Sequence, residues 1–535
     1  MKKIFFILFL FNIYSTYSQE PSISWMKRYG GSVGNLCRSI IATQDGGYFI
    51  GGWSNSETSG VKSEDVIGFN YDYWVIKTNS LGAIEWQKTI GGGTNFAFSE
   101  EFGEVLSVVR QTSDGGYLLG GNSDSPVFGN KTEPTFGLED FWVVKLDTMG
   151  NIQWQKDIGG DSADDLFALE ITADGGCILG GQSRSGISGN KTEVSRGLFD
   201  YWVVKLDALG SIEWQKTIGG SGNDVLTSMV VLENSNYLVA GYSASSISGD
   251  KTDNCKGGAD FWILEIDNQG TILWQKTIGG SDGDLLYKAI KTADGYMFGG
   301  ESLSNISFDK TQDSRGLSDY WIVKTDDTGT LIWDKTYGGS NDDVLIDLKN
   351  SPNGGFVLAG FSNSLISGDK TKINYGRYDG WIVRINDDGA IVWQKSIGGN
   401  DNDGFNHILI QPDSSMVLSG DATSPLSGNI TAYPYGVSDY WLVKLEPETL
   451  VTTNFQTTNC VVYPNPTTDM VTIAFKDFQK EIEVAVYNSL SQKIDVFVAT
   501  DISNYTIPLQ YPDGIYILSI KNQDNTITRI KVVKK

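Results

Sequence analysis

Tryptophan recurs along this chain with a step of about sixty residues, and this period limits the folds that the chain can adopt. Fourteen of the fifteen tryptophans form two interleaved series of seven. One supersecondary unit repeated at a fixed period is typical of a solenoid, a propeller or another repeat array. The first series follows an Asp and usually an aromatic residue: Trp74, Trp142, Trp202, Trp262, Trp321, Trp381 and Trp441. The second usually precedes Gln-Lys: Trp25, Trp86, Trp154, Trp214, Trp274, Trp333 and Trp393.

The third copy shows what one repeat encodes. Apolar runs at 168–172 and 177–181 flank Asp174-Gly175-Gly176, which is hairpin turn chemistry. After a polar loop, two further runs at 201–206 and 212–218 alternate or stay apolar. No stretch of helical length carries the 3.6-residue period. We therefore expect four strands and no helix in each repeat.

Seven such repeats predict an all-β fold, a seven-bladed β-propeller with four-stranded blades. The two ends of the array favour a closed ring over an open solenoid. A lone fourth strand, 23–29, precedes the first complete copy, and the seventh copy stops at Leu445 without a fourth strand. We predict that the N-terminal strand completes the last blade, which would leave no free sheet edge.

Two short patterns resemble those of known propellers. Paired glycines after the second strand, as at Gly180-Gly181, resemble kelch repeats. The run Leu206-Asp207, Gly210 and Trp214 is similar to the tryptophan-docking segment of quinoprotein propellers, with a turn one residue shorter. Both likenesses concern the fold, and no quinone-site residues accompany them.

The first eighteen residues have the pattern of a secretory signal peptide. Lys2 and Lys3 precede an apolar run over 4–13, and small and polar residues follow as far as Ser18. This run is too short to span a membrane, so we expect no transmembrane segment. We expect cleavage after residue 18, and a propeller over residues 19–450.

Near residue 459 the sixty-residue period ends and tryptophan disappears. The last segment resembles the type A sorting domain of the type IX secretion system of Bacteroidetes. The resemblance implies that residues 459–535, after a linker at 451–458, form a small Ig-like β-sandwich that the secretion machinery recognises. It also implies export through the periplasm to the outer cell surface or the medium. The motif residues are Pro464, Asn465, Pro466, Gly514, Tyr516, Lys534 and Lys535.

The chain is acidic, with 65 acidic and 41 basic residues and a net charge of −24. The C-terminal segment is close to neutral, so the repeat region holds nearly all of this charge. A body of this charge repels nucleic acid and anionic lipid. Cations, neutral glycans and basic proteins are the expected partners.

The residues of the chain give little support for a catalytic site. His407 is the only histidine, so any site that needs a histidine must use it. We expect it to be a structural residue at a strand end.

Carboxylates are abundant, so paired-carboxylate chemistry on carbohydrates is an alternative. The carboxylates recur in phase, however, which is typical of scaffold residues. One set precedes the aromatic pair in every copy: Asp72, Asp140, Asp200, Asp260, Asp319, Asp379 and Asp439.

Calcium is the one cofactor that a motif suggests. Residues 219–227 match the nonapeptide of calcium-binding β-rolls. Those sites need consecutive nonapeptides, whereas copies here stand about sixty residues apart. We therefore predict no metal and no cofactor, with loop-bound calcium as the alternative.

The long loop between the second and third strands carries a recurrent lysine, which we expect to be a paired, loop-ordering residue: Lys62, Lys131, Lys191, Lys251, Lys310 and Lys370, with Ile430 in the seventh copy. Binding is better sought where the repeat is broken, because exposed aromatic residues on loops of a rigid frame often contact sugars or peptides. The candidates are Trp53, Phe96, Phe98, Phe102, Tyr375, Tyr378, Tyr433 and Tyr435.

The sequence thus favours a secreted or cell-surface propeller that binds or adheres without catalysis. A carbohydrate-active enzyme and a structural component of a surface layer are the alternatives. The identity of a glycan or protein ligand does not follow from the sequence.

Overall fold

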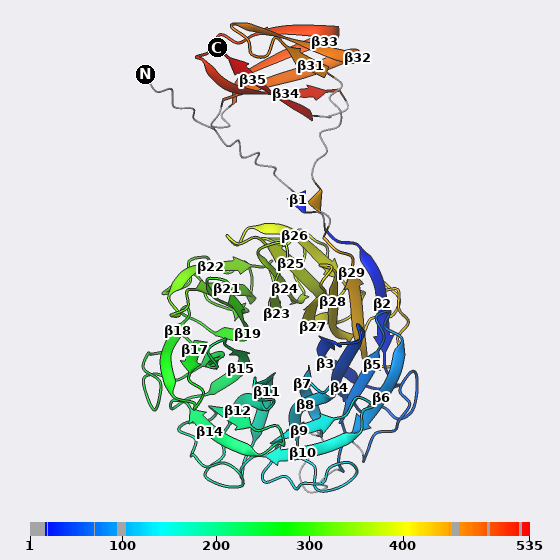
Figure 1. Ribbon diagram of the computed structural model, residues 1–535, viewed down its shortest axis with the longest axis vertical. Coiled ribbons are helices and arrows are strands. Elements are labelled where there is room, and N and C mark those ends of the chain that lie inside the picture. Colours follow the sequence, from blue (N-terminus) through cyan, green and yellow to red (C-terminus); the bar gives the residue numbers. More distant parts are fainter. Residues whose placement is uncertain are drawn as a thin grey trace, which may run out of the picture. The chain divides into compact units, whose positions relative to one another are not determined.

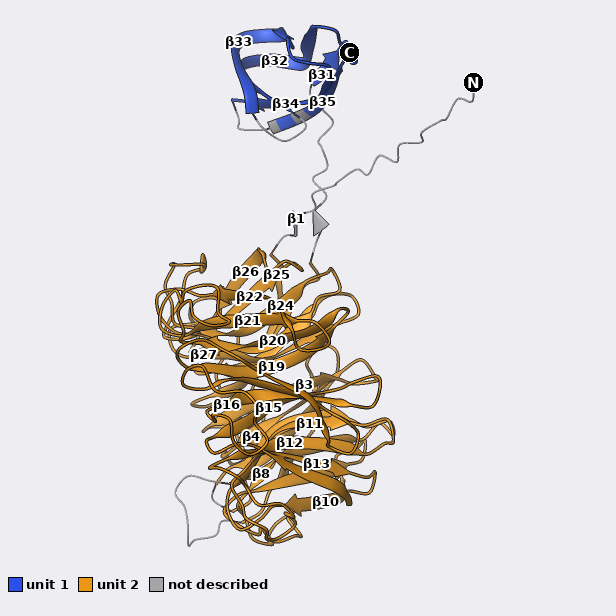
Figure 2. Ribbon diagram, turned by 90° about the vertical axis from the view of Figure 1, so that its left-hand side faces the viewer, with its two compact units in different colours: residues 1–18, 450–535 blue, residues 19–449 orange. Residues whose placement is uncertain are grey.

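The computed structural model describes residues 17–18, 20–68, 70–93, 103–448, 450–451, 460–488, 493–523 and 527–535. The chain divides into two compact units, residues 19–449 and residues 1–18 with 450–535 (Figure 2). All regular secondary structure in the described ranges is β-strand. No helix in these ranges is long and apolar enough to cross a membrane.

The larger unit contains seven four-stranded antiparallel sheets, arranged around a common centre as in a propeller (Figure 1). Six sheets consist of four consecutive strands each: β3–β6 (Asn35–Ala42, Tyr48–Ser54, Asp72–Thr78, Ile84–Ile90), β7–β10 (Val105–Gln111, Tyr117–Ser123, Asp140–Leu146, Ile152–Ile158), β11–β14 (Asp164–Ile171, Cys177–Ser183, Asp200–Leu206, Ile212–Ile218), β15–β18 (Asp224–Val231, Tyr237–Ser243, Asp260–Ile266, Ile272–Ile278), β19–β22 (Asp284–Thr292, Gly295–Ser302, Asp319–Thr325, Leu331–Tyr337) and β23–β26 (Asp343–Asn350, Phe356–Ser362, Asp379–Ile385, Ile391–Ile397).

The seventh sheet joins the two ends of the unit. It orders β2 (Ile23–Tyr29), β29 (Asp439–Leu445), β28 (Met416–Ala422) and β27 (Asp403–Ile410). The pairing runs from Ile23 opposite Leu445 to Tyr29 opposite Tyr440. The pairing expected from the orphan N-terminal strand is therefore present.

Glycines fix both the hairpins and the spacing of the sheets. In the β11–β12 turn, Gly175 has φ +84° and its N–H donates to Thr172 O at 3.0 Å, while Asp174 accepts the N–H of Gly176 at 2.9 Å. Gly180 lies on β12, where a Cβ would stand 2.2 Å from the sulfur of Met229 on the next sheet. The paired glycines thus allow neighbouring sheets to approach closely.

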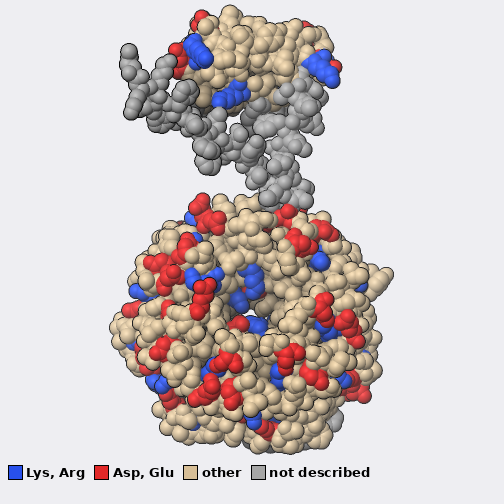
Figure 3. All heavy atoms as spheres, viewed as in Figure 1, with Lys and Arg blue, Asp and Glu red and all other residues tan. Residues whose placement is uncertain are grey.

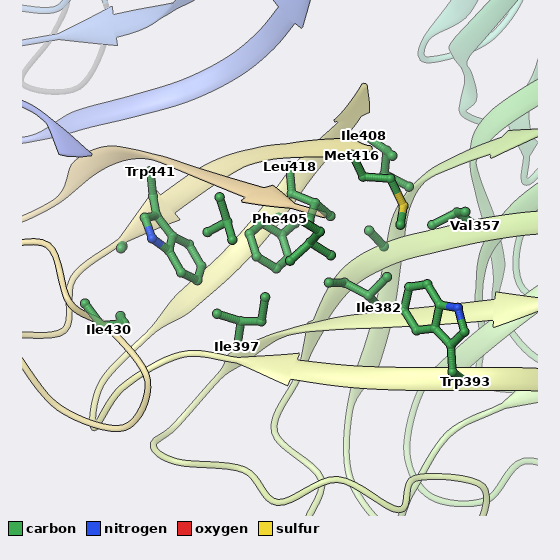
Figure 4. Packing of buried hydrophobic residues seen from close by; sticks show 14 residues of the cluster. Val357, Ile382, Trp393, Ile397, Phe405, Ile408, Met416, Leu418, Ile430 and Trp441 are labelled. Atoms are coloured by element: carbon green, nitrogen blue, oxygen red, sulfur yellow. The ribbon is translucent and has the colours of Figure 1, made fainter. Parts of the chain in front are cut away.

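The hydrophobic cores lie between adjacent sheets. Figure 4 shows the core between the sixth and seventh sheets, where Trp441 and Phe405 point toward Ile382 and Ile397. The rings of Phe405 and Trp441 are stacked with centroids 4.7 Å apart. All seven tryptophans of the first series are fully buried. A large ring buried in this way contributes about 2 to 3 kcal/mol through its area alone.

The tryptophans of the second series lie on the fourth strand of each sheet and are mostly half-buried. Trp214 on β14 packs against Tyr237 of the next sheet, with ring centroids 6.2 Å apart. This series therefore connects neighbouring sheets at their outer strands.

The C-terminal unit contains a five-stranded antiparallel sheet. Its strands are β31 (Cys460–Tyr463), β32 (Met470–Tyr487), β33 (Lys493–Pro508), β34 (Gly514–Asn522) and β35 (Ile527–Lys534), in the order β31-β32-β34-β35 with β33 paired to β32. A separate two-stranded pairing joins β1 (Tyr17–Ser18) and β30 (Leu450–Val451). The core of the larger sheet is aliphatic and includes Val471, Ile473, Val484 and Leu518.

Candidate functional site in the central channel

The first strand of each sheet lines the centre of the ring. These seven strands, β3, β7, β11, β15, β19, β23 and β27, each contact the next, and β27 contacts β3. Figure 3 shows Lys and Arg side chains gathered in the central hollow, with Asp and Glu scattered over the surrounding face. In a protein of net charge −24 this concentration of positive charge is a local exception.

Two cavities lie along this channel, with volumes of about 480 Å³ and 130 Å³. Both are lined by Arg110, Glu170, Met229, Lys288 and His407. Because they share these residues, they are adjoining parts of one channel.

The repeat is broken at one position of the first strand. This position pairs with the first of the paired glycines, or its equivalent, on the second strand. It holds small or neutral residues in four sheets: Ser39, Val108, Ala168 and Ser228. In three consecutive sheets it holds Lys288, Asp347 and His407. Ionisable side chains thus replace the small or neutral residue of the other copies on one side of the channel.

Asp347 is the centre of this group. Its carboxylate lies 3.2 Å from Lys349 Nζ, 4.0 Å from Lys288 Nζ and 3.8 Å from His407 Nδ1. It also accepts the backbone N–H of Ile408 at 2.8 Å, as Ser39 and Ser228 accept the equivalent N–H of their next sheets. Burial opposes its ionisation, but neighbouring positive charge, that of Lys349 foremost, lowers its pKa to about 2.

Two of the three basic neighbours of Asp347 are shifted toward their neutral forms. Burial lowers the pKa of His407 to about 3 even though Asp347 is close, so the imidazole is neutral at pH 7. Burial and the charge of Lys349 lower the pKa of Lys288 to about 8. The histidine lies within β27 and faces the channel, rather than at a strand end as the sequence suggested.

An ion pair from two further sheets adds to the charged lining of the channel. Arg110 donates to Glu170 through Nε at 3.0 Å and Nη2 at 2.5 Å, across neighbouring sheets. Burial raises the pKa of Glu170, but Arg110 outweighs this effect and holds it below its ordinary value. The pair is bidentate, which is the strong geometry for a guanidinium and a carboxylate.

The two channel carboxylates are engaged by cations rather than by the histidine. Both channel carboxylates are ion-paired, and the 3.8 Å between His407 and Asp347 exceeds hydrogen-bonding distance. Among the described residues no group of three or more His, Cys, Asp or Glu side chains could hold a metal ion.

The structure places the predicted loop aromatics in different settings. Trp53 lies on β4, not in a loop, because it pairs with Tyr73 and the strand continues to Ser54. Its ring packs edge-on against Tyr71, with centroids 4.3 Å apart. Phe96, Phe98 and Phe102 lie outside the described residues.

The tyrosines of the late loops are more accessible. Tyr433 is 74% exposed, and Tyr375 and Tyr435 are also exposed. Tyr378 packs edge-on against Phe361, and both line a third cavity of about 320 Å³. This cavity shares Arg38 and Asn406 with the smaller channel cavity, so Tyr378 lines a cavity that adjoins the channel site.

The recurrent aspartates before the aromatic pair are buried and fix the loop that precedes them. Each accepts a backbone N–H four or five residues earlier, as Asp439 does from Tyr435 at 2.8 Å. The same contact occurs at the other six positions. Burial raises the pKa of Asp200 and Asp379 to about 6.

The recurrent loop lysines are buried beside these aspartates and against the tryptophans. Lys251 Nζ lies 4.9 Å from the centroid of the Trp262 ring and donates to Thr277 Oγ1 at 2.8 Å. In the seventh sheet the equivalent Ile430 is also buried.

The motif residues of the C-terminal unit are held together. Asn465 donates to Lys531 O at 2.7 Å and accepts the N–H of Val533 at 2.9 Å, so the Pro-Asn-Pro segment is fixed to β35. Gly514 pairs with Lys534 in the sheet. Tyr516 OH donates to Pro512 O at 2.6 Å, and Lys535 N–H donates to Thr467 O at 2.9 Å.

The channel residues were not among the sequence candidates. They stand in first strands whose remaining sequence resembles that of the other copies: Arg110, Glu170, Lys288, Asp347 and Lys349. The signal that identifies them is a comparison of the seven copies position by position along the first strand. Charged residues occur at these positions in a minority of the copies, and these copies break the repeat.

Comparisons with solved structures give remote likenesses. One is a fungal alcohol oxidase in complex with copper, 11% identical, covering 96% of this chain and 99% of that one with a TM-score of 0.37. Another is YCF48 bound to D1 peptide, 10% identical, covering 80% and 97% with a TM-score of 0.40.

Among characterised sequences, the regulatory protein FlaEY of Caulobacter vibrioides is 24% identical over 306 residues. The match covers 52% of this chain and 31% of that protein, so the chain spans less than a third of this relative. Residues 461–535 match the family model of the secretion system C-terminal sorting domain, and this segment supports secretion of the protein through the type IX system.

Proposed function

We propose that the protein leaves the cell through the type IX secretion system and acts at the surface or in the medium as a seven-bladed, non-catalytic binding or adhesion propeller. The match of residues 461–535 to a sorting domain is the observation that carries the export route. The signal-peptide pattern of residues 1–18 supplies the first step, across the inner membrane.

The binding role is supported by the contrast between the scaffold and the channel. Buried tryptophans, aspartates and loop lysines recur in phase and are accounted for by packing. The channel group of Lys288, Asp347 and His407 does not recur. Lys288 and His407 line the cavity of about 480 Å³, and Asp347 lines the adjoining smaller cavity. A cavity of this size falls in the range of small-molecule sites. The exposed Tyr433 and Tyr375 offer further contact area at the loops.

The enzyme alternative has less support. Carboxylate chemistry on glycans needs one carboxyl group free to donate a proton and another free to attack or activate water. Glu170 and Asp347 are both paired with cations and both have lowered pKa values. Neither is a suitable general acid at neutral pH.

The export step is tested by removing residues 459–535 and fractionating cells with an antibody against the propeller. We expect the truncated protein to fold and to accumulate in the periplasm. Replacement of Phe478, an exposed residue of the same unit, by serine serves as a point-variant control that leaves the unit in place. Truncated protein found at the surface in normal amounts would refute the assignment.

The binding role is tested by screening the mature protein on arrays of glycans and extracellular proteins, and by assaying turnover on the same compounds. We expect a ligand that is retained without being converted. Turnover that is lost in Glu170→Gln or Asp347→Asn at an unchanged melting temperature would establish the enzyme instead.

A further inference from the structure

The channel cavity has a mixed lining. Its charged and polar side chains, Arg110, Glu170, Lys288, Lys349 and His407, come from five of the seven sheets. Aliphatic residues such as Val231 and Ile290 stand among them. A ligand that fits this lining has a polar head and an apolar body.

The charged residues of the lining have a surplus of positive charge. Glu170 is engaged by Arg110 through two hydrogen bonds, and Asp347 lies 3.2 Å from Lys349. Lys288 is left with Asp347 at 4.0 Å and has no hydrogen-bond partner among the described residues. Lys291, which also lines the cavity, is paired with Asp327 at 2.8 Å, so among the described cations of the lining Lys288 alone lacks a carboxylate within hydrogen-bonding distance.

This surplus is costly in the unliganded channel. Lys288 and Lys349 are close enough for the charge of one to lower the pKa of the other. An anion between them would relieve this repulsion and give Lys288 a charged hydrogen-bond partner. A cation would add to the repulsion.

We propose that the channel binds a small organic anion, a carboxylate with an apolar body, whose head group contacts Lys288 and Lys349 and whose body lies against neighbouring aliphatic residues of the lining such as Val231 and Ile290. This inference rests on the proposed binding role of the channel and specifies the chemistry of its ligand. The acidic exterior of the ring does not exclude such a ligand, because the local field at the channel is positive.

The test uses hexanoate as the probe, with hexylamine and hexanol as matched compounds of opposite charge and of no charge. Binding to the mature full-length protein is measured by titration calorimetry. We expect hexanoate to bind at least about tenfold more tightly than either control compound, because only its head group pairs with the free cation. Equal binding of the three compounds would overturn the proposal.

Two variants locate the site. Lys288→Met and Lys349→Met keep the aliphatic stem and remove the charge, and each is expected to weaken hexanoate binding by about tenfold or more. Lys276→Met on the exposed outer strand β18 is the matched control and should bind as the unmodified protein does. Unchanged affinity in a folded Lys288→Met protein would contradict the proposal.

His407 supplies a readout that needs no variant. It is the only histidine of the chain and lines the cavity, so labelled histidine gives one imidazole signal from the channel. Hexanoate is expected to shift this signal in parallel with the calorimetric titration. Heat of binding without a shift would place the ligand elsewhere and overturn the proposal.

The two hypotheses fail differently. If the channel binds only neutral or cationic compounds, the imidazole signal shifts with those compounds and not with hexanoate; the binding role then holds and the anion proposal is wrong. If no compound from the arrays or this series shifts the signal, the channel is not a binding site and both proposals are wrong.

Discussion

Six sheets of the ring are built from consecutive strands, whereas the seventh is built from both ends of the unit. Each of the six contains a buried lysine from its long loop, close to the buried aspartate that begins its third strand. In four of the six a buried aspartate also begins the first strand, whereas β3 begins with Asn35 and Glu104 precedes β7. The seventh has Ile430 in place of that lysine. Its buried cation is Arg28 of β2, which lies 3.9 Å from both Asp403 and Asp439.

Arg28 occupies the position that faces the loop lysine in the other sheets. There the fourth strand carries a small polar residue or Asp157, as with Thr277 opposite Lys251 and Ser396 opposite Lys370. In the seventh sheet the cationic side chain therefore belongs to the fourth strand and not to the loop. The comparison teaches that each sheet buries one basic side chain at this place, and that the seventh receives it only when the ring closes.

The largest effect is expected from deleting residues 20–29. The deletion removes the fourth strand of the seventh sheet, exposes the edge of β29 and leaves Asp403 and Asp439 without a cation. We expect the melting temperature, followed by circular dichroism, to fall by more than about 10 °C, because a whole strand pairing and its core contacts are lost. A synthetic peptide of residues 19–31 should restore part of the loss. An unchanged melting temperature would show that closure contributes nothing.

Removing the closing cation alone should destabilise less. Arg28→Met leaves two buried carboxyl groups without their partner, which costs about 3 to 5 kcal/mol in comparable buried pairs. Protonation of the aspartates offsets part of this cost, so we expect about 3 kcal/mol in denaturant titrations at pH 7.5. Lys251→Met is the matched change in a continuous sheet. Hydrogen exchange should show opening at the seventh sheet for the first variant and at the fourth sheet for the second.

Restoring the usual arrangement in the seventh sheet sharpens the comparison. The double variant Arg28→Thr with Ile430→Lys places the lysine on the loop and the small polar residue on the strand, as in β15–β18. We expect it to be more stable than the sum of the two single variants by about 1 to 2 kcal/mol. Additive single-variant effects would mean that the two positions are not coupled.

The smallest effect is a difference in pH dependence. Burial lowers the pKa of Lys62, Lys191, Lys310 and Lys370 to about 8 in the folded protein. Above pH 8 the unfolded chain therefore binds more protons than the folded protein, so stability relative to a Lys191→Met variant should rise with pH, by about 1 kcal/mol from pH 8 to 9. Stability relative to Arg28→Met should stay flat in this window, because the guanidinium remains charged. Unfolding at both pH values measures the two differences.

The sequence predicted the sheets because their determinants are local. The tryptophan series, the Asp-Gly-Gly turn and the orphan strand at 23–29 identify the strands and their partner at closure. Trp53 was placed wrongly because the paired glycines were taken as the end of the strand, whereas backbone pairing to Tyr73 continues beyond them.

The channel group was harder to predict, for a geometric reason. Each first strand contains an irregularity in register, as between Leu286 and Lys288 or between Leu345 and Asp347. This irregularity breaks the simple alternation of facing side chains, so the pattern does not say which residues face the centre. Ion pairs between sheets, such as Arg110 with Glu170, join residues sixty positions apart and carry no local signal.

Ring closure also determines how the propeller unit responds to force. Ile23 at the start of β2 is paired with Leu445 at the end of β29, and Glu446 N–H donates to Ser22 O at 2.9 Å. The chain therefore enters and leaves the ring at the same end of one antiparallel ladder. Tension between these two points acts on the hydrogen-bonded pairs of β2 and β29 one after another and not on all of them at once. Under a pull on its two ends, the ring therefore opens by separation of β2 from β29, one residue pair at a time. The six continuous sheets carry none of this force.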